Sequence, residues 1–247
     1  MKEVKMRQMQ KQSIFYNQLL CYADEEYKAF TSKLVPNVKP EKIIGVRIPQ
    51  LRKMAKDLMK QSKDDPSNIT TFMITLPHEY FDENNLHGLI LNEEKDFDKT
   101  ISSLELFLPH VDNWASCDII SPKSFKPHKA QLLPHIRRWM DSNHEYTVRF
   151  GIEMLMTHFL NEDFRKEYLQ WVVAVQQNRE VAEKYYVKMM IAWFFATALT
   201  KQYKDTLPVL EQELLEPWTH NMAIQKARES RQISLEVKEY LKTLKKK

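Results

Sequence analysis

The stretch YYVKMMIAWFFATALTKQY, residues 185–203, decides the fold class. Apolar residues occupy nearly every side of a helix here, which is typical of a helix at the centre of a helical protein. Lys188, Lys201 and Tyr203 form its polar edges, and Trp193 lies where a tryptophan is most often part of the core. The run is too short to cross a bilayer, so we expect a soluble protein with a helical core.

Further helical segments flank this stretch, with short connections and prolines at most junctions. We expect helices over residues 13–34, 49–62, 67–76, 79–91, 97–109, 111–121, 127–141, 145–160, 163–177, 181–203, 205–216, 219–231 and 234–246. Successive antiparallel pairs of this length predict an all-α fold, a curved α-solenoid of HEAT-like helix pairs. A compact helical bundle fits the pattern equally well. No linker is visible, so we expect a single domain over residues 1–247.

Composition excludes several classes of protein. Glycine occurs only 3 times in 247 residues, so no glycine-rich loop can hold a nucleotide phosphate. The 2 cysteines are too few for a disulfide framework and form no zinc motif, and we expect neither a cofactor nor a metal. The polar N-terminus lacks the apolar segment of a signal peptide. We therefore expect a cytoplasmic protein.

Charge is distributed unevenly along the chain. Residues 1–60 hold 13 Lys and Arg against 6 Asp and Glu, and residues 220–247 hold 8 against 3. Residues 61–120 hold 3 against 12. Two basic ends suit a polyanion such as nucleic acid, with the acidic segment facing away from it. Solvated helix faces would give the same pattern.

The segment VDNWASCD, residues 111–118, places an aromatic ring and a carboxylate on one helix face. Trp114 and Asp118 are four residues apart, which is one helical turn. The structural alternatives are core packing for Trp114, a surface ion pair for Asp118 and a helix N-cap for Asp112.

The segment TVRFGIEMLMTHFL, residues 147–160, combines an arginine with a glycine inside an apolar helix. Glycine costs roughly 1 kcal/mol relative to alanine there, so Gly151 predicts close approach of another backbone. Arg149 could hold a phosphate or carboxylate with its guanidinium, or form an ion pair with Glu153 one turn later.

Basic residues cluster at two further places, the turn-to-helix junction of residues 43–56 and the segment 220–234. The first is a plausible phosphate-binding helix N-terminus. With Lys188, the candidate cations of these regions are Arg47, Arg52, Lys53, Lys226, Arg228 and Arg231. No metalloprotease, serine hydrolase or paired-carboxylate motif is present, and the 8 histidines are scattered.

Together these segments resemble the DNA alkylation repair family, the AlkD-like HEAT-repeat DNA glycosylases. The resemblance covers nearly the whole chain, and its segments occur in the family's order. They are GVRIPQLRKMAK (45–56), VDNWASCDIISPK (111–123), RRW and VRFGIEMLMTHF (137–159), YYVKMMIAWFFATAL (185–199) and IQKARESRQIS (224–234).

The resemblance implies a monomeric solenoid that grips duplex DNA in a basic concave cleft. It implies excision of cationic alkylated bases such as N3-methyladenine and N7-methylguanine. Trp114, Asp118, Arg149 and Trp193 fall on the family's cleft-lining positions, with Asp118 as the catalytic carboxylate. Some members of the family show little or no glycosylase activity. A non-catalytic protein that binds distorted or branched DNA, or a helical scaffold for other proteins, therefore stays an alternative.

Overall fold

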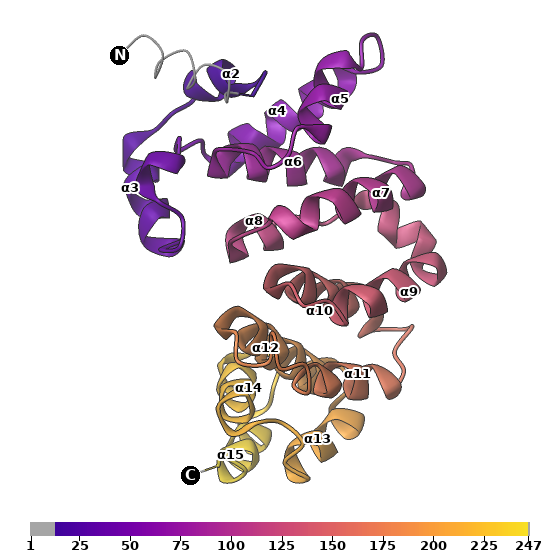
Figure 1. The fold of residues 1–247 in the computed structure, drawn as a ribbon. Coiled ribbons are helices and arrows are strands. Elements are labelled where there is room, and N and C mark those ends of the chain that lie inside the picture. Colours follow the sequence, from indigo (N-terminus) through magenta and orange to yellow (C-terminus); the bar gives the residue numbers. More distant parts are fainter. Residues whose placement is uncertain (1–12, 247) are drawn as a thin grey trace. The chain divides into compact units, whose positions relative to one another are not determined.

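The computed structural model describes residues 13–246, and the chain divides after Pro127 into two compact units. Both are built from α-helices, as the sequence predicts (Figure 1). Within the described residues no β-strand forms, and the only extended pairing is an isolated antiparallel bridge between Ala23 and Val46. No helix in this part of the chain is both long enough and apolar enough to span a bilayer.

The first unit contains seven α-helices among the described residues, with short 3-10 turns between them. They are α2 (Tyr16–Leu20), α3 (Glu25–Leu34), α4 (Ile48–Gln61), α5 (Ser67–Ile74), α6 (Phe81–Glu93), α7 (Phe97–Phe107) and α8 (Trp114–Asp118). The 3-10 turns are η1 (Pro40–Lys42), η2 (Leu108–His110) and η3 (Lys123–His128), the last of which runs into the second unit.

Helix α6 lies at the centre of the first unit and packs against α4, α7 and α8 (Figure 1). Every residue from Phe81 to Asn92 is buried, although six of these twelve residues are polar or charged. Four of the polar side chains reach neighbouring elements, whereas Glu83 and Asn84 bond to the start of α6 itself. Asn92, for example, donates to the Ile119 carbonyl at 2.7 Å and accepts from the Ser121 N–H at 2.5 Å.

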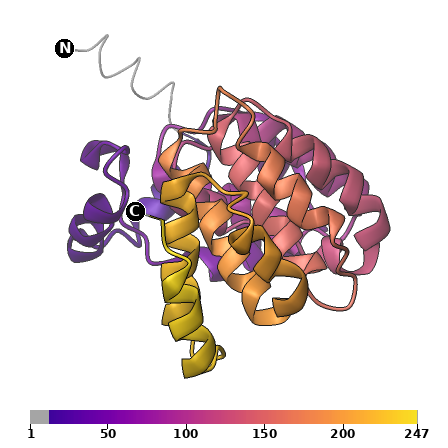
Figure 2. The same cartoon turned by 90° about the horizontal axis from the view of Figure 1, so that it is seen from below.

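The second unit contains seven α-helices over the residues that the structure describes. They are α9 (Lys129–Met140), α10 (Glu145–Phe159), α11 (Glu167–Val175), α12 (Tyr185–Lys201), α13 (Tyr203–Glu211), α14 (Pro217–Glu229) and α15 (Leu235–Thr243). Helix α10 packs against α9 and α12, and α12 packs against α14 (Figures 1 and 2). The core of this unit is therefore centred on α12, the apolar helix from which its fold was predicted.

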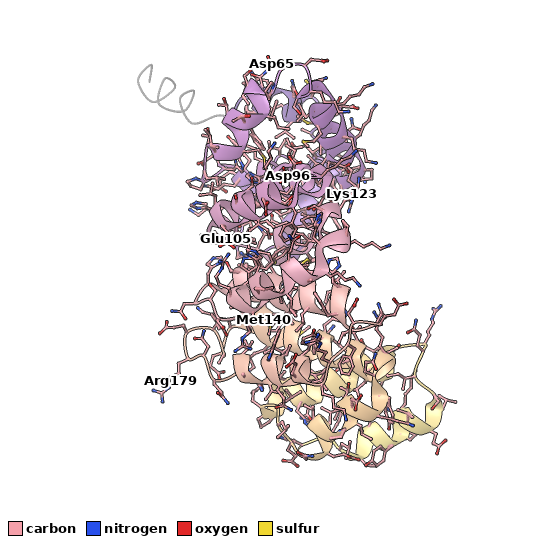
Figure 3. All side chains as sticks on the ribbon, turned by 90° about the vertical axis from the view of Figure 1, so that its right-hand side faces the viewer. Asp65, Asp96, Glu105, Lys123, Met140 and Arg179 are labelled. Carbon is pink, nitrogen blue, oxygen red and sulfur yellow. The ribbon has the colours of Figure 1, made fainter. Side chains whose placement is uncertain are left out.

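Proline and capping residues place most helix boundaries close to the predicted ones. Pro49 lies in the first turn of α4, where its missing N–H needs no partner. Asp96, labelled in Figure 3, is the N-cap of α7, and its side chain accepts the Lys99 N–H at 3.0 Å. Gly151 allows a close approach, since a Cβ there would lie 3.0 Å from the backbone nitrogen of Met140 on α9.

The predicted helix over residues 13–34 is wrong in one respect, because it is interrupted between α2 and α3. Asp24 caps α3 by accepting the Tyr27 N–H at 2.9 Å, and its own N–H donates to the Gly45 carbonyl at 3.1 Å. Ala23 pairs with Val46 in the isolated bridge. The interruption is therefore imposed by a loop more than twenty residues further along the chain.

Candidate functional site

The predicted site residues fall in both units, and each unit holds its own set. Trp114 and Asp118 lie on α8 of the first unit. Arg149 and Trp193 lie on α10 and α12 of the second unit.

Helix α8 is held in place by a buried polar network. Asn113, not Asp112 as the sequence suggested, is its N-cap, and the Asn113 side chain accepts the Ser116 N–H at 2.8 Å. The Ser116 hydroxyl donates to the Asn85 side-chain oxygen of α6 at 2.8 Å. Asp112 is exposed, and its carbonyl accepts a hydrogen bond from the Asn37 side chain. Asn113 takes the cap because it has the extended backbone that directs its side chain at the helix.

Trp114 is half-buried and tied to α3. Its indole Nε1 donates to the carbonyl of Leu34, the last residue of α3, at 3.0 Å. Its ring packs against a small apolar cluster that includes Val35, Ile43 and Phe81. The indole therefore has a fixed orientation, and part of its surface stays accessible.

Asp118 ends α8, one turn after Trp114, so both side chains lie on the same helix face. Its neighbours Cys117 and Ile120 are fully buried, whereas Asp118 is only half-buried. A carboxylate at this position is thus rigidly mounted and in contact with solvent.

A second carboxylate that sequence reasoning missed shapes the loop before α4. Buried Asp82 of α6 accepts the N–H groups of Ile44 at 2.6 Å, Val46 at 2.7 Å and Gly45 at 3.2 Å. Burial raises the pKa of Asp82, and these hydrogen bonds oppose the rise. Gly45 has a φ of +95°, and other residue types adopt this backbone conformation only with strain. No sequence motif identifies Asp82.

This loop places Arg47 at the start of α4. The Arg47 guanidinium lies 2.8 Å from the Asp24 carboxylate and over the Tyr27 ring, 5.3 Å from its centroid. Hydrogen bonds from the Tyr27 N–H and then from Arg47 lower the pKa of Asp24. The Arg47 charge is therefore already compensated, whereas Arg52 and Lys53 are exposed on α4.

In the second unit Arg149 is buried, with only 6% of its surface exposed. Its Nη1 donates to the Tyr186 carbonyl on α12 at 2.9 Å, and the Glu145 carboxylate accepts the Tyr186 N–H at 3.3 Å. These contacts join α10 to the first turn of α12. A phosphate contact by Arg149 stays a prediction.

Trp193 is 41% exposed, although it belongs to the most apolar helix of the chain. Ile191, Ala192, Phe194 and Phe195 around it are all buried. Core packing, the usual role of a tryptophan in such a helix, therefore does not explain Trp193.

Two predicted DNA-facing cations of this unit have carboxylate partners. The Lys188 ammonium lies 3.1 Å from the Glu216 carboxylate and 5.3 Å from the Trp218 ring centroid. Burial acts to raise the pKa of Glu216, but hydrogen bonds from Thr219 and Lys188 outweigh it and lower that pKa.

Arg228 lies 3.4 Å from Glu239, whereas Arg231, just beyond α14, is exposed. Of the predicted cations of the second unit, Arg231 is therefore the best placed to meet an external anion.

A model of the family described as DNA alkylation repair enzyme matches residues 17–194, which is more than half of the chain. The match includes α8, α10 and the first part of α12, with all four predicted site residues. No curated protein and no solved structure is similar enough to match.

Proposed function

Because the chain belongs to the DNA alkylation repair enzyme family, which gives it a DNA repair role with DNA as its partner, we propose that it is a DNA glycosylase. Its substrates are cationic alkylated purines, N3-methyladenine and N7-methylguanine, in duplex DNA. The observation that carries the proposal is the half-buried Asp118 carboxylate, mounted one helical turn from a fixed indole.

The chemistry needs no general acid. An alkylated purine already carries a positive charge and is a good leaving group, and positive charge moves to the deoxyribose as the glycosidic bond breaks. The Asp118 carboxylate stabilises this cation and orients the attacking water. At a separation of about 5 Å and an effective dielectric constant of about 20, Coulomb's law gives roughly 3 kcal/mol, or on the order of a hundredfold in rate.

The two tryptophans supply selectivity for charge. Trp114 contacts the sugar and phosphates next to the lesion, Trp193 contacts the DNA from the second unit, and an aromatic face attracts a nearby cation by about 0.5–2 kcal/mol. A neutral base gains neither this attraction nor the help of Asp118. Selection of damaged bases then follows from charge, without hydrogen bonds to base edges.

The arginines and lysines hold the DNA backbone. Arg149, whose guanidinium is fixed by the Tyr186 carbonyl, sets the register on a phosphate. Exposed Arg52, Lys53 and Arg231 contribute most of the salt-dependent affinity. The contributions of Arg47, Lys188 and Arg228 are smaller, because each already has a carboxylate partner.

The test is release of bases from methylated duplex DNA, detected by mass spectrometry. Asp118→Asn is expected to abolish release of 7-methylguanine while duplex binding persists. Asp112→Asn, an exposed aspartate six positions earlier, is the matched control and should keep full activity. Equal activity of Asp118→Asn and the parent would remove Asp118 from the mechanism. Salt-dependent DNA binding with no base release by the parent would instead support a non-catalytic DNA-binding protein.

A further inference from the structure

A pocket of about 480 Å³ opens between α12 and the end of α14 in the second unit. Trp193, Thr197 and Lys201 form a stripe along α12 on one side, spaced about four residues apart, so that they share one face. The other side comes from Lys226 and the turn after α14. Apart from Trp193, all the lining residues lie beyond the stretch that the family model matches.

Trp193 supplies a flat apolar wall at one end of this pocket. All five tryptophans of the chain lie among the described residues, and Trp193 is the one that is exposed. An accessible indole is a stacking platform for any nucleobase, since every base has a π-face.

The charged groups of the pocket are mainly cationic. Lys201, Lys226 and Arg231 line it together with a single carboxylate, Glu229, which accepts a hydrogen bond from the Gln225 side chain at 3.2 Å. Side-chain cations therefore dominate the charge of the pocket.

Two other features of the lining restrict how an anion can bind. The hydroxyls of Thr197 and Thr200 donate back to the carbonyls of Trp193 and Ala196, so they do not donate into the pocket. The end of α14 carries partial negative charge, so backbone groups there do not attract an anion. The charged groups of the pocket that can hold an anion are its lysine and arginine side chains.

We propose that this pocket binds one unpaired deoxynucleotide of a DNA strand, with its base stacked on Trp193 and its phosphate held by Lys226 and Arg231. The volume lies in the range of pockets that hold a small organic ligand. The inference rests on the DNA partner of the proposed function but does not require base release.

Binding of two single strands of equal length and charge to the full chain tests this proposal. One is a short oligothymidylate and the other is a stable abasic strand with tetrahydrofuran in place of each nucleoside. The parent is expected to bind the base-bearing strand about tenfold more tightly, as one stacked base provides. Trp193→Ala should lose this preference but still bind the abasic strand, and Trp193→Phe should retain it.

The double variant Lys226→Gln, Arg231→Gln tests whether these two cations hold the phosphate. It is expected to bind both strands about tenfold more weakly, whereas Lys204→Gln, an exposed charge on α13, should match the parent. No preference of the parent for bases, an unchanged preference in Trp193→Ala, or equal binding by the double variant and Lys204→Gln would overturn the proposal. Asp118→Asn separates the two proposals, because this variant should lose base release and keep the preference for the base-bearing strand.

Discussion

A pair of histidines, His87 buried and His78 half-buried, is expected to make the first unit sensitive to acid. His78 Nε2 lies 2.9 Å from His87 Nδ1. His78 stacks on Phe72 with ring centroids 4.3 Å apart, and His87 stacks on Phe107 with centroids 3.8 Å apart. Burial, with a contribution from the nearby His110, lowers the pKa of His78 to about 4. Burial also lowers the pKa of His87, and the neighbouring histidines add to this effect.

The size of the effect follows from the pKa difference between the folded and unfolded chain. His78 has its ordinary pKa of 6.5 when unfolded, so below that pH the unfolded chain takes up the proton first. The stabilisation is complete above the unfolded pKa and is lost as the pH falls toward the folded value. At about 1.4 kcal/mol for each pKa unit, about 2 kcal/mol is lost by about pH 5 and about 3 kcal/mol by about pH 4. His87 changes stability in the same direction.

Hydrogen exchange of the α6 amides measures this loss within the first unit. After correction for intrinsic exchange rates, His78 should lower the free energy of opening of α6 by about 2 kcal/mol between neutral pH and about pH 5, while the raised pKa values of Asp82 and Glu83 on the same helix act in the opposite direction. His78→Gln cannot become charged and can still donate to His87, so it should lose about 2 kcal/mol less over that range. An equal loss of protection in His78→Gln and in the parent would refute the reasoning.

Two further substitutions test how the site is supported. The Asp82 carboxylate accepts the N–H groups of residues 44–46, and Asp82→Asn leaves one acceptor oxygen for these three donors. The substitution should therefore lower the free energy of unfolding by about 1–3 kcal/mol. Thermal unfolding measures this loss, and the control Asp57→Asn, at an exposed position, should match the parent. Gly151→Ala should lower the midpoint of thermal unfolding. A Cβ at this position would lie 3.0 Å from the Met140 nitrogen and cost about 1–3 kcal/mol, which outweighs a helix-propensity gain of about 1 kcal/mol. A higher midpoint would contradict the close contact.

Local sequence signals predicted the helices well because local physics sets most of their boundaries. Pro49 and Ser67 lie at or near the starts of α4 and α5, as the sequence indicated. The break between α2 and α3 was missed because it depends on the contact of Asp24 with Gly45, which no local pattern reveals.

The candidate site was less predictable, because charge pairing depends on residues that are distant in sequence. Lys188 meets Glu216, and Arg149 meets the carbonyl of Tyr186, across separations that composition cannot reveal. The exposure of Trp193 likewise depends on how α12 and α14 leave a gap at one position. Asp112 and Asn113 are both good N-caps by residue type, and the structure places Asn113, with its extended backbone, at the cap.

The buried polar helix α6 has a consequence for how the first unit tolerates change. Apolar side chains of similar volume can often replace one another, whereas a buried donor needs its own acceptor at a fixed place. Asp82 bonds to the loop of residues 44–46, whereas Asn85 and Asn92 bond to α8 and the residues just after it. A library that replaced the polar residues of α6 with leucine or alanine should therefore yield chains that collapse but have no unique arrangement of those segments. In directed evolution of this protein, we therefore expect tolerated substitutions to be more frequent in α4 and α7 than in α6, which packs against both.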